Sequence, residues 1–173
     1  MVKKLFNPIK QKIMSDNMKN LKFFFIIVVF SIMSYFIVSN FILKTYVVNG
    51  NSMNPTLSNS QIVFAKKFSH TYKQGDIVII KDPEDSGLSI KRIIAIENQT
   101  VMLKNGDVYV NGVILNEPYL IVGTKTFSYK YMVETVTCGK NQYYVLGDNR
   151  HDSADSRIYG PVPSKNILAI VQQ

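Results

Sequence analysis

The sequence contains one run of 21 uncharged residues, 23–43, closed by Lys22 and Lys44. A helix of about 20 predominantly apolar residues crosses the hydrocarbon core of a bilayer. A buried helix of a soluble protein would normally carry a polar face, and this run has none. A cleaved secretory signal has a shorter apolar core, of about 7–15 residues, and ends in small residues spaced as in Ala-x-Ala, which are absent here. We therefore expect an uncleaved transmembrane anchor.

The basic residues concentrate before this run. The chain has a formal net charge of +8, and residues 1–22 hold six lysines against one acidic residue, Asp16. Lysines beside a membrane span tend to stay in the cytoplasm, so we expect residues 1–22 inside the cell and residues 44–173 outside the cytoplasm. The protein would then be a single-pass protein of the cell membrane, in contact with lipid. The large domain has no clustered basic patch, which argues against nucleic acid as a partner.

The residues that could hold a metal are few. The chain has one cysteine, Cys138, and two histidines, His70 and His151, which lie far apart. A single cysteine excludes an intramolecular disulfide. Neither histidine has another Cys or His at the spacing of a metal site. We expect no metal and no cofactor.

Residues 44–173 show short apolar runs bounded by turn residues, the pattern of a mainly β fold with antiparallel sheets. Two Asn-Gly pairs, beginning at Asn105 and Asn111, favour tight type I′ turns, in which both central residues need positive φ. The chain is therefore expected to comprise a basic segment, 1–22, an anchor, 23–43, and one all-β domain, 44–173. The expected strands are residues 45–48, 61–66, 76–81, 88–96, 100–103, 108–110, 113–115, 131–137, 143–146 and 167–171.

Ser52 lies in a turn-forming segment, Asn-Gly-Asn-Ser-Met-Asn-Pro-Thr-Leu at residues 49–57. Pro55 has no N–H with which to continue a strand. Such a turn can present a hydroxyl beside free backbone N–H donors, the combination that a serine peptidase needs for its nucleophile and its oxyanion. Serine is also a common turn former, so this segment alone leaves both interpretations open.

A serine nucleophile needs a base, and three residues are candidates. His70 and His151 lie in polar stretches typical of loops, and a Ser–His pair with either of them stays open. Lys91 lies in the most apolar strand of the domain, where burial would lower the pKa of the ammonium and make it a general base. The alternative is that Lys91 or its neighbour Arg92 extends from a strand edge into solvent.

A polar loop follows the strand expected at 143–146. An ordinary solvated loop needs fewer hydrogen-bonding groups than this one contains, so its composition indicates a loop that fixes itself and orients groups nearby. Its polar side chains are Asp148, Asn149, Arg150, Asp152, Ser153, Asp155, Ser156 and Arg157.

Together these segments resemble the type I signal peptidases, the membrane-bound Ser–Lys peptidases that remove signal peptides from exported proteins. Four family motifs occur in matching order, and the resemblance extends from the anchor to near the C-terminus. One such motif is weak, whereas four in order are specific. They are Ser-Met-x-Pro-Thr-Leu at 52–57, Gly-Asp-Ile-Val at 75–78, Lys-Arg followed by apolar residues at 91–94, and Gly-Asp-Asn-Arg-x-x-Ser-x-Asp-Ser-Arg at 147–157.

The resemblance implies a serine endopeptidase that cuts secretory preproteins after small-x-small sites. It implies that Ser52 attacks the scissile carbonyl, that Lys91 takes its proton, and that the Ser52 backbone N–H donates to the oxyanion. It further implies that Ser153 hydrogen-bonds the Lys91 amine. An ion pair between Asp155 and Arg157 would brace the site.

Two positions depart from the pattern of some members. Gly50 stands where those members carry a second hydroxyl for the oxyanion hole, although short Gram-positive-type members also have glycine there. His151 stands where acidic residues are common.

The same strands suggest a substrate pocket. Tyr46 and Val48 lie at even spacing from Ser52, and Ile90 adjoins Lys91. We expect these residues to wall shallow apolar pockets for small side chains, which matches the Ala-x-Ala preference of signal-peptide cleavage sites.

Two other classes of protein share some of these features. Repressor-type self-cleaving peptidases have a related β fold and a lysine on an apolar strand, but they are cytosolic and carry a DNA-binding domain. A catalytically silent, membrane-tethered paralogue or binding module would be favoured if Ser52 or Lys91 were missing, and both are present. We expect a monomer.

Overall fold

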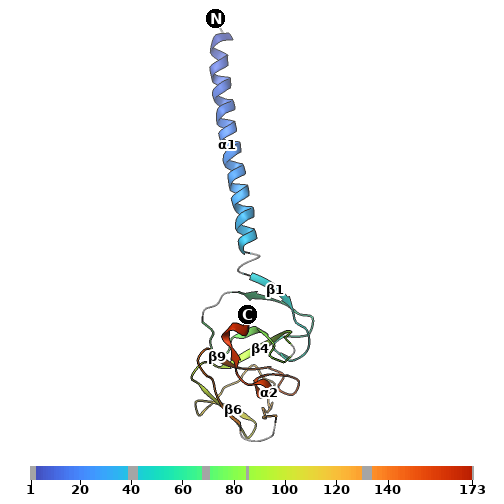
Figure 1. Cartoon of the computed structure of the whole chain (residues 1–173). Helices are drawn as coiled ribbons and strands as arrows, with labels where there is room; N and C mark the ends of the chain where they lie inside the picture. The colour runs from blue at the N-terminus through green and yellow to red at the C-terminus, as the bar shows by residue number, and fades with distance from the viewer. Residues whose placement is uncertain (1–2, 39–42, 68–70, 85, 130–133, 173) are drawn as a thin grey trace. The chain divides into compact units, whose positions relative to one another are not determined.

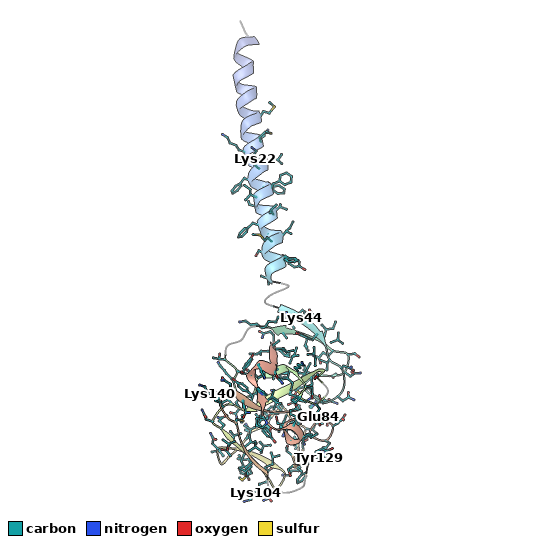
Figure 2. All side chains as sticks on the ribbon, in the orientation of Figure 1. Lys22, Lys44, Glu84, Lys104, Tyr129 and Lys140 are labelled. Atoms are coloured by element: carbon teal, nitrogen blue, oxygen red, sulfur yellow. The ribbon has the colours of Figure 1, made fainter. Side chains whose placement is uncertain are left out.

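The computed structural model describes residues 3–38, 43–67, 71–84, 86–129 and 134–172 (Figure 1). The chain forms two compact units, Met1–Ile42 and Leu43–Gln173. The first unit contains helix α1 (Lys3–Ile37). Its segment Asn17–Phe36 is 20 residues long and apolar enough to cross a membrane. The large apolar side chains of this segment are exposed and project from the helix (Figure 2).

The helix and the expected anchor differ at both ends. The basic residues from Lys3 onward belong to the same helix as the apolar run. The helix ends at Ile37, whereas Leu43, the last residue of the expected span, begins strand β1 (Leu43–Val47). Leu43 lies in a strand because residues 43–47 pair with β2, and this pairing satisfies their backbone hydrogen-bonding groups without a helix. Residues 39–42 of the expected span lie outside the described residues.

The described part of the second unit is built from antiparallel strands in two sheets. The seven-stranded sheet has the order β1-β2-β11-β3-β4-β9-β10, and the four-stranded sheet has the order β7-β6-β5-β8. After β1, the elements are β2 (Ile62–Lys66), β3 (Ile77–Lys81), β4 (Leu88–Ala95), β5 (Thr100–Lys104), β6 (Asp107–Val110), β7 (Val113–Ile114), β8 (Glu134–Thr137), β9 (Gln142–Leu146), α2 (Ser156–Tyr159), β10 (Val162–Pro163), the 3₁₀ turn η2 (Ser164–Asn166) and β11 (Ile167–Val171).

This architecture confirms the mainly β, antiparallel fold that the sequence predicts. Both Asn-Gly pairs form hairpin turns: φ is 55° at Asn105 and 81° at Gly106, and 52° at Asn111 and 79° at Gly112. They join β5 to β6 and β6 to β7. Residues 131–133 of the strand expected at 131–137 lie outside the described residues. The sequence analysis did not predict β10 or α2.

Strand β3 lies inside the core because both of its faces are covered. Ile77 and Ile79 pack in one apolar cluster, whereas Val78 and Ile80 pack in another. A continuous apolar run is typical of a strand that is buried on both faces. Strand β4 pairs with β3 along its length, which brings the middle of β4 into the same water-poor region.

Candidate active site

Ser52 lies in the turn after β1, and apolar side chains anchor this turn. Met53 and Leu57 are buried in the cluster that includes Ile79. The N–H of Leu57 donates to the carbonyl oxygen of Met53 at 2.9 Å, which closes the turn. Because the neighbouring residue, Met53, is buried in the core, the backbone that carries the Ser52 hydroxyl is held in place.

Lys91 reaches this serine from β4. It lies opposite Val78 of β3, and only 3% of its surface is exposed. Its Nζ donates a hydrogen bond to Ser52 Oγ at 3.3 Å. Burial lowers the pKa of Lys91, and the charges of Asp155 and Asp82 oppose that shift by favouring the ammonium. The alternative that Lys91 extends into solvent does not hold.

Arg92 is buried as well and joins three of the sequence motifs. Its Nε and Nη2 donate to the Asp148 carboxylate at 2.9 and 2.7 Å. Its other hydrogen bonds go to the Gly75 carbonyl oxygen at 2.9 Å and to Thr56 Oγ1 at 3.4 Å. One arginine beside Lys91 therefore ties the turn that carries Ser52 to the loop at 147–157.

Gly147 allows that loop to approach Ser52. A Cβ at this position would overlap Ser153 Oγ and would lie 2.5 Å from the Ser52 carbonyl oxygen. The same carbonyl oxygen accepts a hydrogen bond from the Asn149 N–H at 2.9 Å. Ser153 Oγ is buried and has no hydrogen-bond partner among the residues that the structure describes. The structure thus brings Ser153 beside the Ser52 backbone, while the Lys91 amine is directed at Ser52 Oγ.

Asp155 and Arg157 form an ion pair at 2.8 Å. The carboxylate of Asp155 is buried, accepts from the Arg157 backbone N–H as the N-cap of α2, and accepts from the Gly147 N–H at 3.0 Å. Asp155 therefore fixes the glycine on which Ser52 and Ser153 pack.

An open groove of about 410 Å³ contains the Ser52–Lys91 pair. Tyr46, Val48 and Ile90 all line it. The rest of its lining comes from the Ser52 turn, from β3 and β4, and from the polar loop: Val47, Asn49, Gly50, Asn51, Met53, Ile79, Leu88, Ser89 and Asp152. The groove therefore presents an apolar wall beside a hydroxyl and an amine.

The two histidines occupy other positions. His151 is exposed and lines a separate hollow with Ser153, whereas His70 lies outside the described residues. Within the part of the chain that the structure describes, no three His, Cys, Asp or Glu side chains gather as a metal site would require. A serine hydroxyl beside a buried amine suits acyl transfer, in which the amine takes the hydroxyl proton as oxygen attacks a carbonyl.

Two residues that contact the buried arginines around the site were not predicted from the sequence. Glu117 forms an ion pair with Arg150 at 2.5 Å, and the Tyr119 ring lies 3.9 Å from the guanidinium carbon of Arg92. Both contacts join residues far apart in the sequence, so no local pattern reveals them.

Comparisons with known proteins show which family and which solved structures the chain resembles. Residues 18–173 match the family "Signal peptidase, peptidase S26". The chain is 37% identical over 162 residues to "Signal peptidase I V" of Bacillus subtilis, which covers 87% of this chain and 96% of that one. It is 36% identical over 138 residues to "Signal peptidase I P" of B. subtilis subsp. natto, covering 75% of each chain. The crystal structure of a signal peptidase I from Enterococcus faecalis is similar, with a TM-score of 0.52 and 25% identity, over 61% of this chain and all of that one.

Proposed function

The chain belongs to the signal peptidase family, peptidase S26, and from this premise we propose that Ser52 and Lys91 are the catalytic dyad with which it processes preproteins. Its function is that of a signal peptidase I, a serine endopeptidase. The observation that carries the dyad is the 3.3 Å contact between Ser52 Oγ and the Nζ of a buried lysine.

The dyad works by acylation of Ser52 followed by hydrolysis of the acyl-enzyme. Neutral Lys91 takes the proton of Ser52 Oγ while this oxygen attacks the scissile carbonyl, and the backbone N–H of Ser52 donates to the oxyanion. Lys91 then passes the proton to the leaving amine, and an acyl-enzyme remains on Ser52. Lys91 then takes a proton from water as the water attacks the acyl carbonyl, and it returns this proton to Ser52 Oγ as the ester bond breaks, which releases the product acid and restores the dyad.

The polar loop supports Lys91 during these proton transfers. Each time Lys91 has taken a proton, from Ser52 or from water, it is a buried ammonium, which needs a hydrogen-bond acceptor. The hydroxyl of Ser153 is buried and finds no partner in the described part of the chain, and it is the group that we assign to this task. Asp155 and Arg157 hold the loop in place through their ion pair and the bond to Gly147.

The groove selects the substrate. Tyr46, Val48 and Ile90 wall it, and they leave room for small apolar side chains next to the scissile bond, in keeping with small-x-small cleavage sites. The substrates are therefore the signal-peptide regions of secretory preproteins.

Membrane insertion determines on which side of the membrane the proposed active site lies. We assign residues 1–22 to the cytoplasm, the apolar part of α1 from residue 23 onward to the membrane anchor, and the second unit, which begins with β1, to an extracytoplasmic catalytic domain, because lysines precede the apolar segment. The anchor holds the site of a monomer near the lipid surface where cleavage regions emerge. Cysteines placed singly in residues 1–22 and on the second unit, labelled in intact cells with an impermeant reagent, test this orientation.

Cleavage of a secretory preprotein by the full chain in detergent tests the proposed dyad, with Ser52→Ala and Lys91→Ala beside the wild type. We expect the wild type to cut after a small residue and both variants to lose activity. Retained activity in Lys91→Ala would assign the base to another residue, and His151→Ala would follow. A folded wild type that leaves every preprotein intact would contradict the proposal.

A further inference from the structure

Gly147 is held from both sides by buried charged groups. Its N–H donates to Asp155, and its carbonyl oxygen accepts from Arg150 Nε at 3.0 Å. Because Ser52 and Ser153 pack directly on this residue, its position sets theirs. What fixes Arg150 therefore also fixes the nucleophile.

Arg150 depends on Glu117. The side chain of Arg150 is 0% exposed and that of Glu117 is 11% exposed. The Nη1 and Nη2 of Arg150 donate to the two carboxylate oxygens of Glu117 at 3.2 and 2.5 Å, and Nη1 also donates to Thr126 Oγ1. A buried guanidinium whose carboxylate is removed carries an uncompensated charge, so it moves toward water or binds other groups.

Tyr119 connects this pair to the strand that carries Lys91. Its hydroxyl donates to Glu117 Oε1 at 2.7 Å, and its ring covers the guanidinium of Arg92. Arg92 in turn binds Asp148, the residue after Gly147. Glu117 thus contacts Arg150, which binds Gly147, and Tyr119 contacts Arg92, which binds Asp148.

We propose that Glu117 is a positioning residue for the dyad: through Arg150 and with the help of Tyr119, it sets Gly147 and thereby the alignment of Ser52 and Ser153. This inference rests on the proposed function. None of Glu117, Tyr119 and Arg150 lines the groove at Ser52, so their effect falls on the chemical step and leaves substrate binding unchanged.

Steady-state kinetics of the full chain in detergent test this role with a soluble peptide substrate. Glu117→Gln keeps the side-chain shape but removes the charge. We expect it to lower kcat by about 10–100-fold with KM unchanged, because small misplacements of reacting groups cost about that much. Tyr119→Phe keeps the ring on Arg92 and removes one hydrogen bond to Glu117, and we expect a several-fold fall in kcat with KM unchanged.

A matched control separates positioning from general instability. Leu103→Ala removes a buried side chain of β5, which is none of the residues Glu117, Tyr119, Arg150 and Gly147, and is expected to lower the melting temperature with kcat retained. Retained kcat in a folded Glu117→Gln, or a rise in KM with kcat unchanged, would overturn the proposal. If Glu117→Gln does not fold, an unchanged kcat in Tyr119→Phe overturns it. A wild type that cleaves, beside an inactive Ser52→Ala, shows that such a failure concerns Glu117 and not the proposed function.

Discussion

Lys91 is the residue whose chemistry depends most on its surroundings. Burial penalises the ammonium and lowers the pKa, while Asp155 and Asp82 favour the ammonium and recover part of the shift. The balance leaves the pKa of Lys91 below its ordinary value. A general base works best when its pKa approaches the working pH, and the buried position in β4 supplies that change without a histidine.

The pH dependence of activity follows from this balance. We predict that kcat/KM rises with pH along an acid limb whose pKa lies below that of an ordinary lysine, because only neutral Lys91 accepts the Ser52 proton. Asp155→Asn removes a charge that raises the pKa of Lys91, so the limb should move to lower pH even if kcat falls. Profiles of kcat/KM against pH check both statements. A limb that moves upward in Asp155→Asn would contradict them.

The close packing around Gly147 leads to a prediction about adding a side chain there. Gly147→Ala should reduce kcat at least about 100-fold, since its Cβ would collide with Ser153 Oγ and the Ser52 carbonyl oxygen. Gly139→Ala is the matched control, because its Cβ would approach only the flexible Gln142 side chain. Peptide cleavage rates of the two variants decide the matter, and similar rates would argue against close packing at Gly147.

The conformation of the turn that carries Ser52 explains why position 50, two residues before the serine, is a glycine. Gly50 has a φ of 97°, in a region that other residues rarely adopt, and its N–H donates to Asn59 Oδ1 at 2.9 Å. A serine here would have to strain the turn or leave this conformation. The backbone conformation of the turn therefore accounts for the absence at position 50 of the second hydroxyl that some members of the family carry.

We predict that Gly50→Ser fails to add an oxyanion donor. The substitution should cost about 1–2 kcal/mol of stability, because it forces a side chain into the left-handed region, and kcat should stay equal or fall. Thermal unfolding and peptide cleavage measure the two effects. A gain in kcat would show that the turn accepts a second hydroxyl.

Local signals predicted the elements and motifs that are local. The Asn-Gly pairs at 105–106 and 111–112 predicted both hairpins because Asn and Gly adopt positive φ more readily than other residues. Ser52 and Lys91 were found from motifs within short segments. Helix α2 was missed because its four residues are set by the Asp155 cap and by tertiary contacts, such as that of Ser156 Oγ with the Val145 N–H. Glu117 was missed because its partner Arg150 lies 33 positions away.

At the scale of the whole molecule, the two units give a prediction about tethering. A chain cut to residues 43–173 should fold and cleave soluble peptides at a rate close to that of the full chain, because the groove residues all lie in the second unit. It should cleave membrane-inserted preproteins much more slowly, since the tether raises the local concentration of enzyme at the surface.

Parallel assays with the two substrates in detergent and in vesicles measure this difference. Detergent is needed with the cut chain because Val47, Ile62 and Phe64 are exposed on β1 and β2. Equal rates on the membrane-inserted substrate would contradict a positional role of the first unit.

The polar loop at 147–157 belongs to the last part of the domain, whereas Ser52 belongs to the first. Ribosomes make the amino-terminal part first, so the nascent chain carries the proposed nucleophile before it carries Gly147 and Asp155. During that interval the serine is an ordinary alcohol, without the loop that packs on it. The proposed site is therefore complete only after residues 147–157 have been made and have packed on the turn that carries Ser52.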